Sequence, residues 1–360
     1  MRPRNNRRNG FLFVAGTMLA LLFLALPARA GSLAPLGLPT VPSGNPQTPE
    51  KIELGKKLFF DRRLSGDGTM SCASCHIPDQ AFTDGQELSL SYPTTRNWRN
   101  APTLLNVAFS KRLFHDGRAA SLEEQALFPV MSPFEMNLNL DFLEEKIRIV
   151  PEYKAAFRKV FGGEANLKRI AMAIASFERT LVSVNAPLDR FLKENENALS
   201  AEARKGYEVF TGKGKCSDCH FGPHLSDDRF HALGVPENPE TRKDPRIAAT
   251  RRFVAKVSGY DDYGNLAEDP GRYLVTKDRK DWKAFRTPTL LEVSKTAPYM
   301  HNGMLKTLEE VIDFFDRGGG LGNGALSPLG LTKEERRALK TFLVEALSGN
   351  EIRVRIPQIP

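Results

Sequence analysis

The sequence predicts a mainly α-helical protein with long loops and little strand, built from two similar halves. Helix is predicted because capping signals precede apolar residues at helical spacing, whereas alternating strand patterns are weak almost everywhere. Two halves are predicted because a short motif and a longer repeat each occur twice, once in each half. With 360 residues, 41% of them hydrophobic, the chain has room for about two domains with cores of their own.

The N-terminus, residues 1–30, has the pattern of a secretory signal peptide. Arginines precede an apolar stretch from Phe11 to Leu26, and Ala28-Arg29-Ala30 is typical of a cleavage site. An uncleaved anchor is the alternative, although the stretch is short for a membrane span. The leader carries five arginines and no acid, so its removal lowers the formal charge from +8 to about +3. No nucleic-acid partner is therefore inferred, and the mature chain is expected in the periplasm without a membrane span.

The elements after the leader follow from local signals. Residues 31–47 are rich in Pro, Gly and Ser and predict an extended arm. Thr48-Pro49-Glu50 combines a capping threonine, a proline and an acid, which predicts the start of a helix. Further helices are predicted to begin at Ser121, to cover 141–161, 167–184 and Ser200–Phe210, and to run from the capping box Thr332–Glu335 towards a C-cap at Gly349.

Two C-x-x-C-H motifs contain all four cysteines of the chain. They are Cys72, Cys75 and His76 in the first half, and Cys216, Cys219 and His220 in the second. Two thiols at this spacing can add to the vinyl groups of one porphyrin, and the next histidine can ligate its iron. A dithiol redox site would need a βαβ context that the sequence lacks, and a zinc site would leave both adjacent histidines unexplained. The motifs therefore predict two covalently bound haem c groups.

Each half is accordingly expected to be a cytochrome c-like haem domain, with residues 31–195 forming the first and 196–360 the second. A longer repeat supports an internal duplication: Pro102–Val107 matches Pro288–Val293 at five of six positions. Thirteen residues after each proline comes a histidine followed by an Asx-Gly pair. The second half must also contain an insertion, somewhere within 225–275, because its motif lies farther from its repeat.

The two haems are predicted to differ in function. The loop 77–114 contains neither histidine nor methionine, so the first iron lacks a local sixth ligand and is predicted to be the open, reactive one. The alternative is that His115 or a methionine folds back onto it. The second haem is predicted to relay electrons, with Met300, Met304 or His301 as its candidate sixth ligand.

Reaction at an open iron also requires a group that moves a proton. Glu135 lies in the apolar segment Pro133-Phe134-Glu135-Met136, where an acidic side chain calls for a functional explanation. Carboxylates are among the groups that transfer protons in enzymes. The alternative is a helix cap or a surface acid. Arg286, just before the second Pro-Thr-Leu-Leu segment, is predicted to pair with a haem propionate, with a surface cation as the alternative. His224 and His231 receive no role.

The mature chain resembles bacterial dihaem cytochrome c peroxidases and their MauG-type relatives from end to end. The resemblance is carried by the two haem motifs, Arg99–Pro102, Phe114–Arg118, Ser121–Gln125, Phe134–Met136 and Ala297–Gly303. It implies that Glu135 is the distal catalytic glutamate and Gln125 the distal glutamine. It also implies a calcium between the haems, held by the Asn100 side chain and by the carbonyls of Thr296 and Pro298.

Three departures from the family pattern matter. The histidine that blocks the first haem in the peroxidases is missing, and Tyr92 lies near its place. His115 stands where relatives carry a tryptophan between the haems. Phe315 stands at the position of the relatives' methionine or tyrosine ligand to the second haem, and it cannot bind iron. Either Met300 or Met304 substitutes, or the second iron is also five-coordinate.

The resemblance implies a periplasmic peroxidase that reduces hydrogen peroxide at the N-terminal haem, with electrons relayed through the C-terminal haem. The electrons would come from a small c-type cytochrome or cupredoxin. One alternative is a MauG-like enzyme that uses peroxide to oxidise a side chain, such as tryptophan, of a partner protein. A second alternative is a dihaem electron carrier without enzymatic activity.

Overall fold

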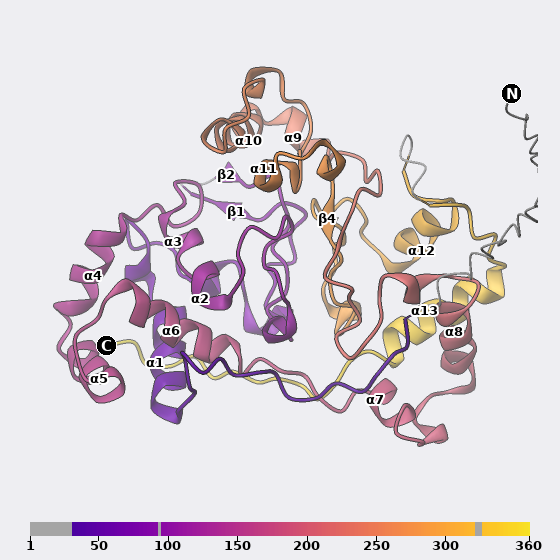
Figure 1. The fold of residues 1–360 in the computed structure, drawn as a ribbon, viewed down its shortest axis with the longest axis horizontal. Helices are drawn as coiled ribbons and strands as arrows, with labels where there is room; N and C mark the ends of the chain where they lie inside the picture. Colours follow the sequence, from indigo (N-terminus) through magenta and orange to yellow (C-terminus); the bar gives the residue numbers. More distant parts are fainter. Residues whose placement is uncertain (1–30, 93–94, 321–325) are drawn as a thin grey trace, which may run out of the picture.

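The computed structural model describes residues 31–92, 95–320 and 326–360. This described part is mainly helical, and its regular strands form two short antiparallel pairs, β1 (Leu90–Ser91) with β2 (Thr95–Arg96) and β3 (Phe230–His231) with β4 (Phe285–Arg286). Figure 1 shows a helical group at each end, loops between them and a smaller lobe above. The predicted signal peptide lies outside the described residues. Within them, no helix is long and apolar enough to cross a membrane.

The first half is organised around a pair of helices, α1 and α6. Its helices are α1 (Pro49–Phe60), α2 (Leu122–Gln125), α3 (Phe128–Met131), α4 (Leu140–Arg148), α5 (Pro151–Phe161) and α6 (Leu167–Glu178). Thr48 caps α1 as predicted, because its side chain accepts the Lys51 N–H. Gly55 lets the two helices touch, since a Cβ there would overlap the Ala173 carbonyl oxygen. Aromatic and aliphatic side chains of both helices fill the first core.

The second half repeats this arrangement with α8 and α13. Its helices are α7 (Pro187–Phe191), α8 (Ala201–Thr211), α12 (Leu308–Asp316) and α13 (Lys333–Glu345). Ser200 caps α8 and the Thr332 capping box begins α13, both as predicted. Gly206 has the role of Gly55, because a Cβ there would overlap the Ala338 carbonyl oxygen. Each half thus buries one face of its haem-motif helix against a later helix of the same half.

The smaller lobe is the insertion of the second half. It leaves the body after β3, returns at β4, and contains α9 (Glu240–Lys243), α10 (Pro245–Val257) and α11 (Tyr273–Thr276). A small apolar cluster of its own, around Ala255, Leu266 and Leu274, holds it together. The insertion predicted between the second motif and its repeat is therefore a folded unit, which lies above α2 and the β1–β2 pair in Figure 1.

Both ends of the described chain cross to the opposite half (Figure 1). The N-terminal arm pairs with the second half through Leu33 and Gly222 and buries Leu36 in the second core. The C-terminal tail returns to the first half, where Ile352 and Val354 pack on the first core. The second core begins before the predicted domain boundary after residue 195, because Leu188 of α7 already belongs to it. The two halves are therefore tied together at both ends.

Short 3-10 turns complete the backbone at Arg62–Leu64, Cys72–Ser74, Pro78–Gln80, Val107–Phe109, Glu196–Ala198, Cys216–Asp218, Tyr263–Asn265, Arg279–Asp281 and Val293–Lys295. Two helix predictions were too long. The helix expected over 141–161 is divided into α4 and α5 because Pro151 begins a new helix, and that expected over 167–184 ends at Glu178. The C-cap prediction at Gly349 was wrong: α13 ends at Glu345 with Ala346 as its cap.

Candidate haem sites and distal pocket

One cavity of about 990 Å³ runs between the two halves and reaches both C-x-x-C-H motifs. Its lining includes Cys72, Cys75, His76, Cys216, Cys219 and His220. Most of the remaining lining is apolar, as expected of a porphyrin site, with a small number of charged groups that point to chemistry. The predicted cofactor residues are thus brought together around a single space, although Cys72 and Cys216 lie 144 positions apart in the sequence.

The two motifs have the same backbone geometry. In each, the histidine N–H donates to the carbonyl of the first cysteine, at 3.0 Å for His76 and 2.9 Å for His220. All four cysteines are free thiols. Burial raises the pKa of Cys75 to about 11, that of Cys219 to about 11 and that of Cys216 to about 12. Neutral thiols at neutral pH argue against a thiolate redox pair, which needs a lowered pKa.

The two histidines are oriented for ligation through Nε2. The Nδ1–H of His76 donates to the Phe82 carbonyl at 3.0 Å, and that of His220 donates to the Leu225 carbonyl at 2.9 Å. These bonds fix the tautomer and leave Nε2 free, as metal-binding histidines require. Burial lowers the pKa of both rings, which keeps them neutral. The residues present therefore fit two c-type haems.

The repeated segments make the same contacts in both halves. The hydroxyl of Thr103 donates to the Ala81 carbonyl, and that of Thr289 donates to the His224 carbonyl, just before each histidine's acceptor. Asn106 and Glu292 both have positive φ, 61° and 63°, and their N–H groups donate to Leu181 and Leu347 after the paired helices. The sequence repeat is therefore also a repeat of contacts. Its origin by internal duplication stays a prediction.

The predicted distal residues of the first half, Gln125 and Glu135, both line the cavity. Gln125 ends α2, and Glu135 lies on the loop after α3. The strand region holds this loop, because the Ser91 hydroxyl and the Tyr92 N–H both donate to the Phe134 carbonyl. Tyr92 is not among the cavity-lining residues, so its backbone supports the loop rather than its side chain entering the site.

Burial raises the pKa of Glu135, while the Arg118 charge, a hydrogen bond from Ser132 and the Arg99 charge act in the opposite direction. Glu135 therefore keeps its proton to a higher pH than an ordinary glutamate. An acid whose pKa moves towards neutrality by burial is a candidate for proton transfer.

In the second half, the two described positions that can be compared with the distal segment are apolar. Counting from the histidines of the repeat, Val311 of α12 stands at the position of Gln125, and Phe315 at that of Pro129. Val311 and Phe315 both line the cavity. α12 continues for nine residues because it has no proline, whereas the corresponding segment of the first half is divided into α2 and α3. Both of these positions in the second half are thus apolar.

The structure separates the candidate sixth ligands. Met300 lines the cavity, and Met304 is not among the lining residues. His301 is stacked on Phe285, with ring centroids 3.6 Å apart and planes 11° apart. The Nε2–H of His115 donates to the Asn100 carbonyl at 3.0 Å, so this nitrogen is already used. Met300 therefore remains the candidate for the second iron.

Four predicted site residues, one for a propionate and three for calcium, also line the cavity. Arg286 is buried, its pKa is lowered by burial, and its nearest acid is Asp228 at 3.6 Å, so a propionate would complete its pairing. The Asn100 amide donates to the Gln86 carbonyl at 2.6 Å, which turns its own oxygen to the other side. Asn100 lines the cavity together with Thr296 and Pro298, and all three offer the neutral oxygens that calcium accepts.

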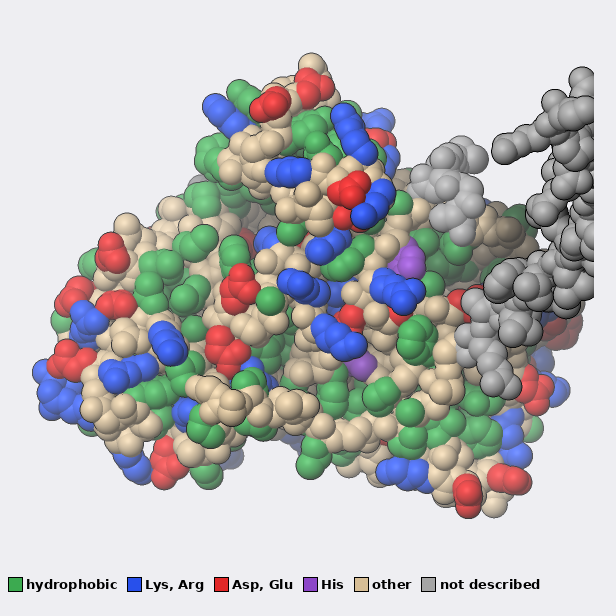
Figure 2. Space-filling model, in the orientation of Figure 1, with side chains coloured by type: hydrophobic (Ala, Val, Ile, Leu, Met, Phe, Trp, Pro, Cys, Tyr) green, Lys and Arg blue, Asp and Glu red, His purple; other side chains and the backbone are tan. Residues whose placement is uncertain are grey.

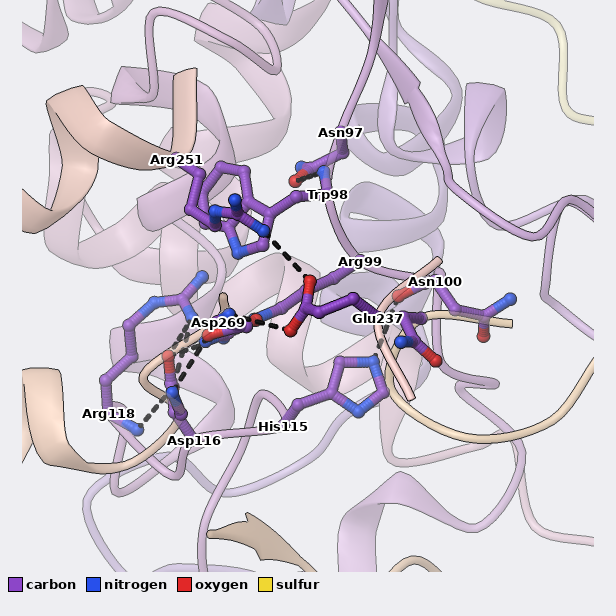
Figure 3. Close-up of polar contacts among 12 residues, drawn as sticks. Asn97, Trp98, Arg99, Asn100, His115, Asp116, Arg118, Glu237, Arg251 and Asp269 are labelled. Carbon is purple, nitrogen blue, oxygen red and sulfur yellow. Dashed lines mark hydrogen bonds and ion pairs between the residues drawn. The ribbon is translucent and has the colours of Figure 1, made fainter. Parts of the chain in front are cut away.

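Sequence analysis missed a buried network of charges beside the distal pocket (Figure 3). Arg99 contacts Asp116 of the first half and Asp269 of the insertion, and Asp116 also contacts Arg118. Arg99, Asp116 and Arg118 lie in segments that carried the resemblance, which was the available signal. Asp269 gave none, because it is 170 residues from its partner.

A second missed residue is Glu178, which is 4% exposed and lines the cavity from α6. One carboxylate oxygen has no hydrogen-bond partner among the described residues, and burial raises the pKa of this acid to about 8. The signal was an acid directly after the mostly apolar segment Ile174–Phe177, since buried acids are rare without a partner. Figure 2 shows, in addition, that Lys and Arg side chains gather over the middle of this face, below the insertion.

Comparisons with known proteins agree with this geometry. The family model for di-haem cytochrome c peroxidase matches residues 49–197. Cytochrome-c peroxidase IdrP2 of Denitromonas iodatirespirans is 44% identical over 353 residues, which cover 98% of this chain and 93% of that protein. The methylamine utilization protein MauG of Methylorubrum extorquens is 36% identical over 324 residues, which cover 89% and 84%. A crystal structure of a MauG-like protein associated with microbial copper homeostasis matches with a TM-score of 0.72 at 28% identity, over 86% of this chain and 93% of that one.

Proposed function

Because the chain belongs to the di-haem cytochrome c peroxidase family, we propose that it reduces hydrogen peroxide in the periplasm, at the site around His76. The observation that carries the proposal is the difference between the two sides of the cavity. The side above the first motif offers Gln125 and Glu135, whereas the second offers Val311 and Phe315. A buried carboxyl group is therefore present at the first site, whereas apolar side chains stand at the two compared positions of the second.

Haem iron bound by His76 would supply the electrons that break the peroxide O–O bond. The chain's own residues then have separate tasks. The Phe82 carbonyl holds the His76 ring in the tautomer that leaves Nε2 free. Glu135 takes the proton from one peroxide oxygen and returns it to the other, which leaves as water. Gln125 orients peroxide by hydrogen bonding, because an amide can both donate and accept.

Two electrons and two protons must be supplied for each peroxide converted into two water molecules. We assign the entry of the electrons to the second haem site, held by His220, with a small c-type cytochrome or cupredoxin as the donor. Arg286 lies between the sites: its N–H donates to the His115 carbonyl at 2.8 Å, which joins the two halves. Asn100, Thr296 and Pro298 would hold calcium at this junction, where its charge would favour electron arrival.

A second candidate function has an observation of its own. The described part of the loop after the first motif contains no histidine, and Tyr92 is not in the cavity lining. A site without a blocking side chain can react without prior reduction, as oxidation of a partner protein requires. The 36% identity to a MauG protein is consistent with this alternative. The product distinguishes it: a mass increase or crosslink in a partner, instead of oxidised donor cytochrome.

The test is Glu135→Gln in the haem-loaded protein. If Glu135 moves the proton, peroxide turnover should fall on the order of 10²–10⁴-fold while haem content is unchanged. Glu152→Gln, an exposed acid of α5, is the matched control and should turn over normally. The spectrum of the resting oxidised protein should contain a high-spin component from the open first iron. Unchanged turnover in Glu135→Gln would remove this residue from the mechanism, and two low-spin haems would indicate an electron carrier.

A further inference from the structure

A continuous chain of buried charges leads from the insertion to the distal pocket (Figure 3). Asp269 of the insertion accepts two hydrogen bonds from Arg99, from Nε at 2.7 Å and from Nη2 at 2.9 Å. Arg99 Nη1 donates to Asp116 at 2.6 Å. Both oxygens of Asp116 accept hydrogen bonds from Arg118 Nη1, at 3.0 and 2.9 Å. Asp269 and Arg118 are thus linked through Arg99 and Asp116, in that order.

The insertion fixes Asp269 before it meets Arg99. The Asp269 N–H donates to Glu237 at 2.9 Å, and the Gly271 N–H donates to the Asp269 carboxylate at 2.9 Å. Glu237 is in turn paired with Arg251 of α10 at 2.9 Å. The backbone and a helix of the insertion therefore determine where this carboxylate lies.

Burial restricts the geometry of this chain of charges. The side chains of Arg99, Asp116 and Asp269 are only 8, 6 and 2% exposed. A buried charge without its partner is costly, so Arg99 cannot leave Asp269 without leaving an unpaired charge behind. Its planar fork also matches the two carboxylates at fixed angles. The pair therefore sets the position of Asp116 as well.

The far end of the chain of charges lies in the same cavity as the proton-transfer group. Arg118 is the most exposed member, at 32%, and it lines the cavity together with Glu135. Its guanidinium lies 3.4 Å from the centroid of the Phe114 ring, so it is held between this ring and Asp116. The Arg118 charge opposes the effect of burial on the pKa of Glu135 more strongly than the Arg99 charge does. Ser132 and the Cys75 sulfur are the other groups that act on this carboxyl.

We propose that Asp269 is a positioning residue of the peroxide site: through Arg99 and Asp116 it holds the Arg118 guanidinium in the cavity that Glu135 also lines. This inference rests on the proposed function of Glu135. It gives the insertion, which only the second half contains, a role in the reaction. This segment would determine the position of the charge beside the proton-transfer group. Arg272 supports the same junction, because its Nη1 donates to the Asp116 carbonyl at 2.8 Å.

Position and charge predict opposite results for Asp269→Asn. If Asp269 acts only through its charge, its neutralisation makes the surroundings more positive, and Glu135 should lose its proton at a lower pH. If Asp269 positions Arg118, its neutralisation releases Arg99 and lets Arg118 move away, and Glu135 should lose its proton at a higher pH. The direction of the shift therefore separates the two explanations.

The experiment measures the pH midpoint of the Glu135 carboxylic-acid band by infrared difference spectroscopy of the haem-loaded protein, with Glu135→Gln identifying the band. Asp269→Asn should raise the midpoint by about 0.5–1 pH unit, and Arg118→Gln by about 1 unit or more. The double variant should not exceed Arg118→Gln alone. Asp261→Asn, an exposed acid of the same insertion, is the matched control and should leave the midpoint unchanged.

A charge-conserving variant guards against misfolding of Asp269→Asn. Arg99→Lys keeps the charge but loses the fork that binds both carboxylates, so it should also raise the midpoint. The proposal is overturned if Arg99→Lys leaves the midpoint unchanged, or if Asp269→Asn lowers it while Arg118→Gln raises it. It is also overturned if Arg118→Gln has no effect. Failure of the proposed function looks different: Glu135→Gln would then turn over peroxide normally, whatever the midpoints of the other variants.

Discussion

The two halves of the molecule hold their haem motifs alike and cover them differently. Each half pairs the helix before its motif with a later helix at a glycine, and each frees the Nε2 of its histidine by bonding Nδ1 to a carbonyl. Above the motif the halves diverge, because Pro129 lies in the first segment and Phe315 at the same place in the second. The comparison shows that one scaffold can carry two different cavity faces.

The same divergence recurs on the paired helices. Glu178 of α6 lines the cavity in the first half, and Leu343 of α13 lines it in the second. At two compared positions, a polar or acidic side chain of the first half, Gln125 or Glu178, is thus replaced by an apolar one in the second, Val311 or Leu343. Apolar surroundings suit electron transfer because it needs no proton. Peroxide cleavage, in contrast, requires a group that transfers a proton.

The largest effect on stability is expected where the halves are most alike. Gly55→Ala and Gly206→Ala should each lower the free energy of unfolding by about 3 kcal/mol, because the new methyl group meets a carbonyl of the paired helix. Chemical denaturation of the haem-loaded protein would measure both. Gly37→Ala, in open space on the arm, is the control and should be neutral. If only one of the two glycines tolerates alanine, the helix contacts of the halves are not equivalent.

The next effect is on activity, where the halves differ. Gln125→Val gives the first site the residue of the second, and it should lower kcat/KM for peroxide by about 10–100-fold because one hydrogen bond to peroxide is lost. Val311→Gln, the reciprocal change, should leave peroxide kinetics within about 2-fold, since no proton moves there. Steady-state kinetics with both variants gives the answer. Equal losses would mean that both sites handle peroxide.

A smaller effect is expected on the pH dependence of stability. Burial raises the pKa of Glu178 in the folded protein to about 8, whereas the unfolded chain has the ordinary glutamate pKa of 4.5. Between these values the folded state binds more protons, so this residue's contribution falls as pH rises, by at most about 1.4 kcal/mol per pH unit. Glu178→Gln lacks this loss and should gain stability relative to the parent from pH 5 to pH 8. A difference that does not change with pH would show that Glu178 is ionised in the folded protein.

The smallest effect on stability, but a visible one in the spectrum, is expected from Phe315→Met. The volumes are similar, so the cost should stay below about 1.5 kcal/mol. The new thioether lines the cavity of the second half and should give that haem a low-spin, six-coordinate spectrum. An unchanged spectrum would indicate that Met300 already occupies the position.

Local patterns predicted much of this architecture. Helix starts at Thr48, Ser121, Ser200 and Thr332 were right because a cap is decided by a side chain and a backbone N–H a few residues away. Helix ends were less certain: Pro151 divided one predicted helix, and Gly349 lies beyond the end of another. A helix end depends on what the next segment packs against, which local spacing does not contain.

The sequence by itself determined the local features of this protein: two thiol pairs with an adjacent histidine, a repeat without gaps, and an acid in an apolar loop. These depend on neighbours in the chain, so spacing suffices. The tertiary structure alone decided that both motifs face one cavity, that Met300 and not Met304 lines it, and that Asp269 meets Arg99. Such contacts join residues far apart in the chain, and only the packing of the whole chain brings them within hydrogen-bonding distance.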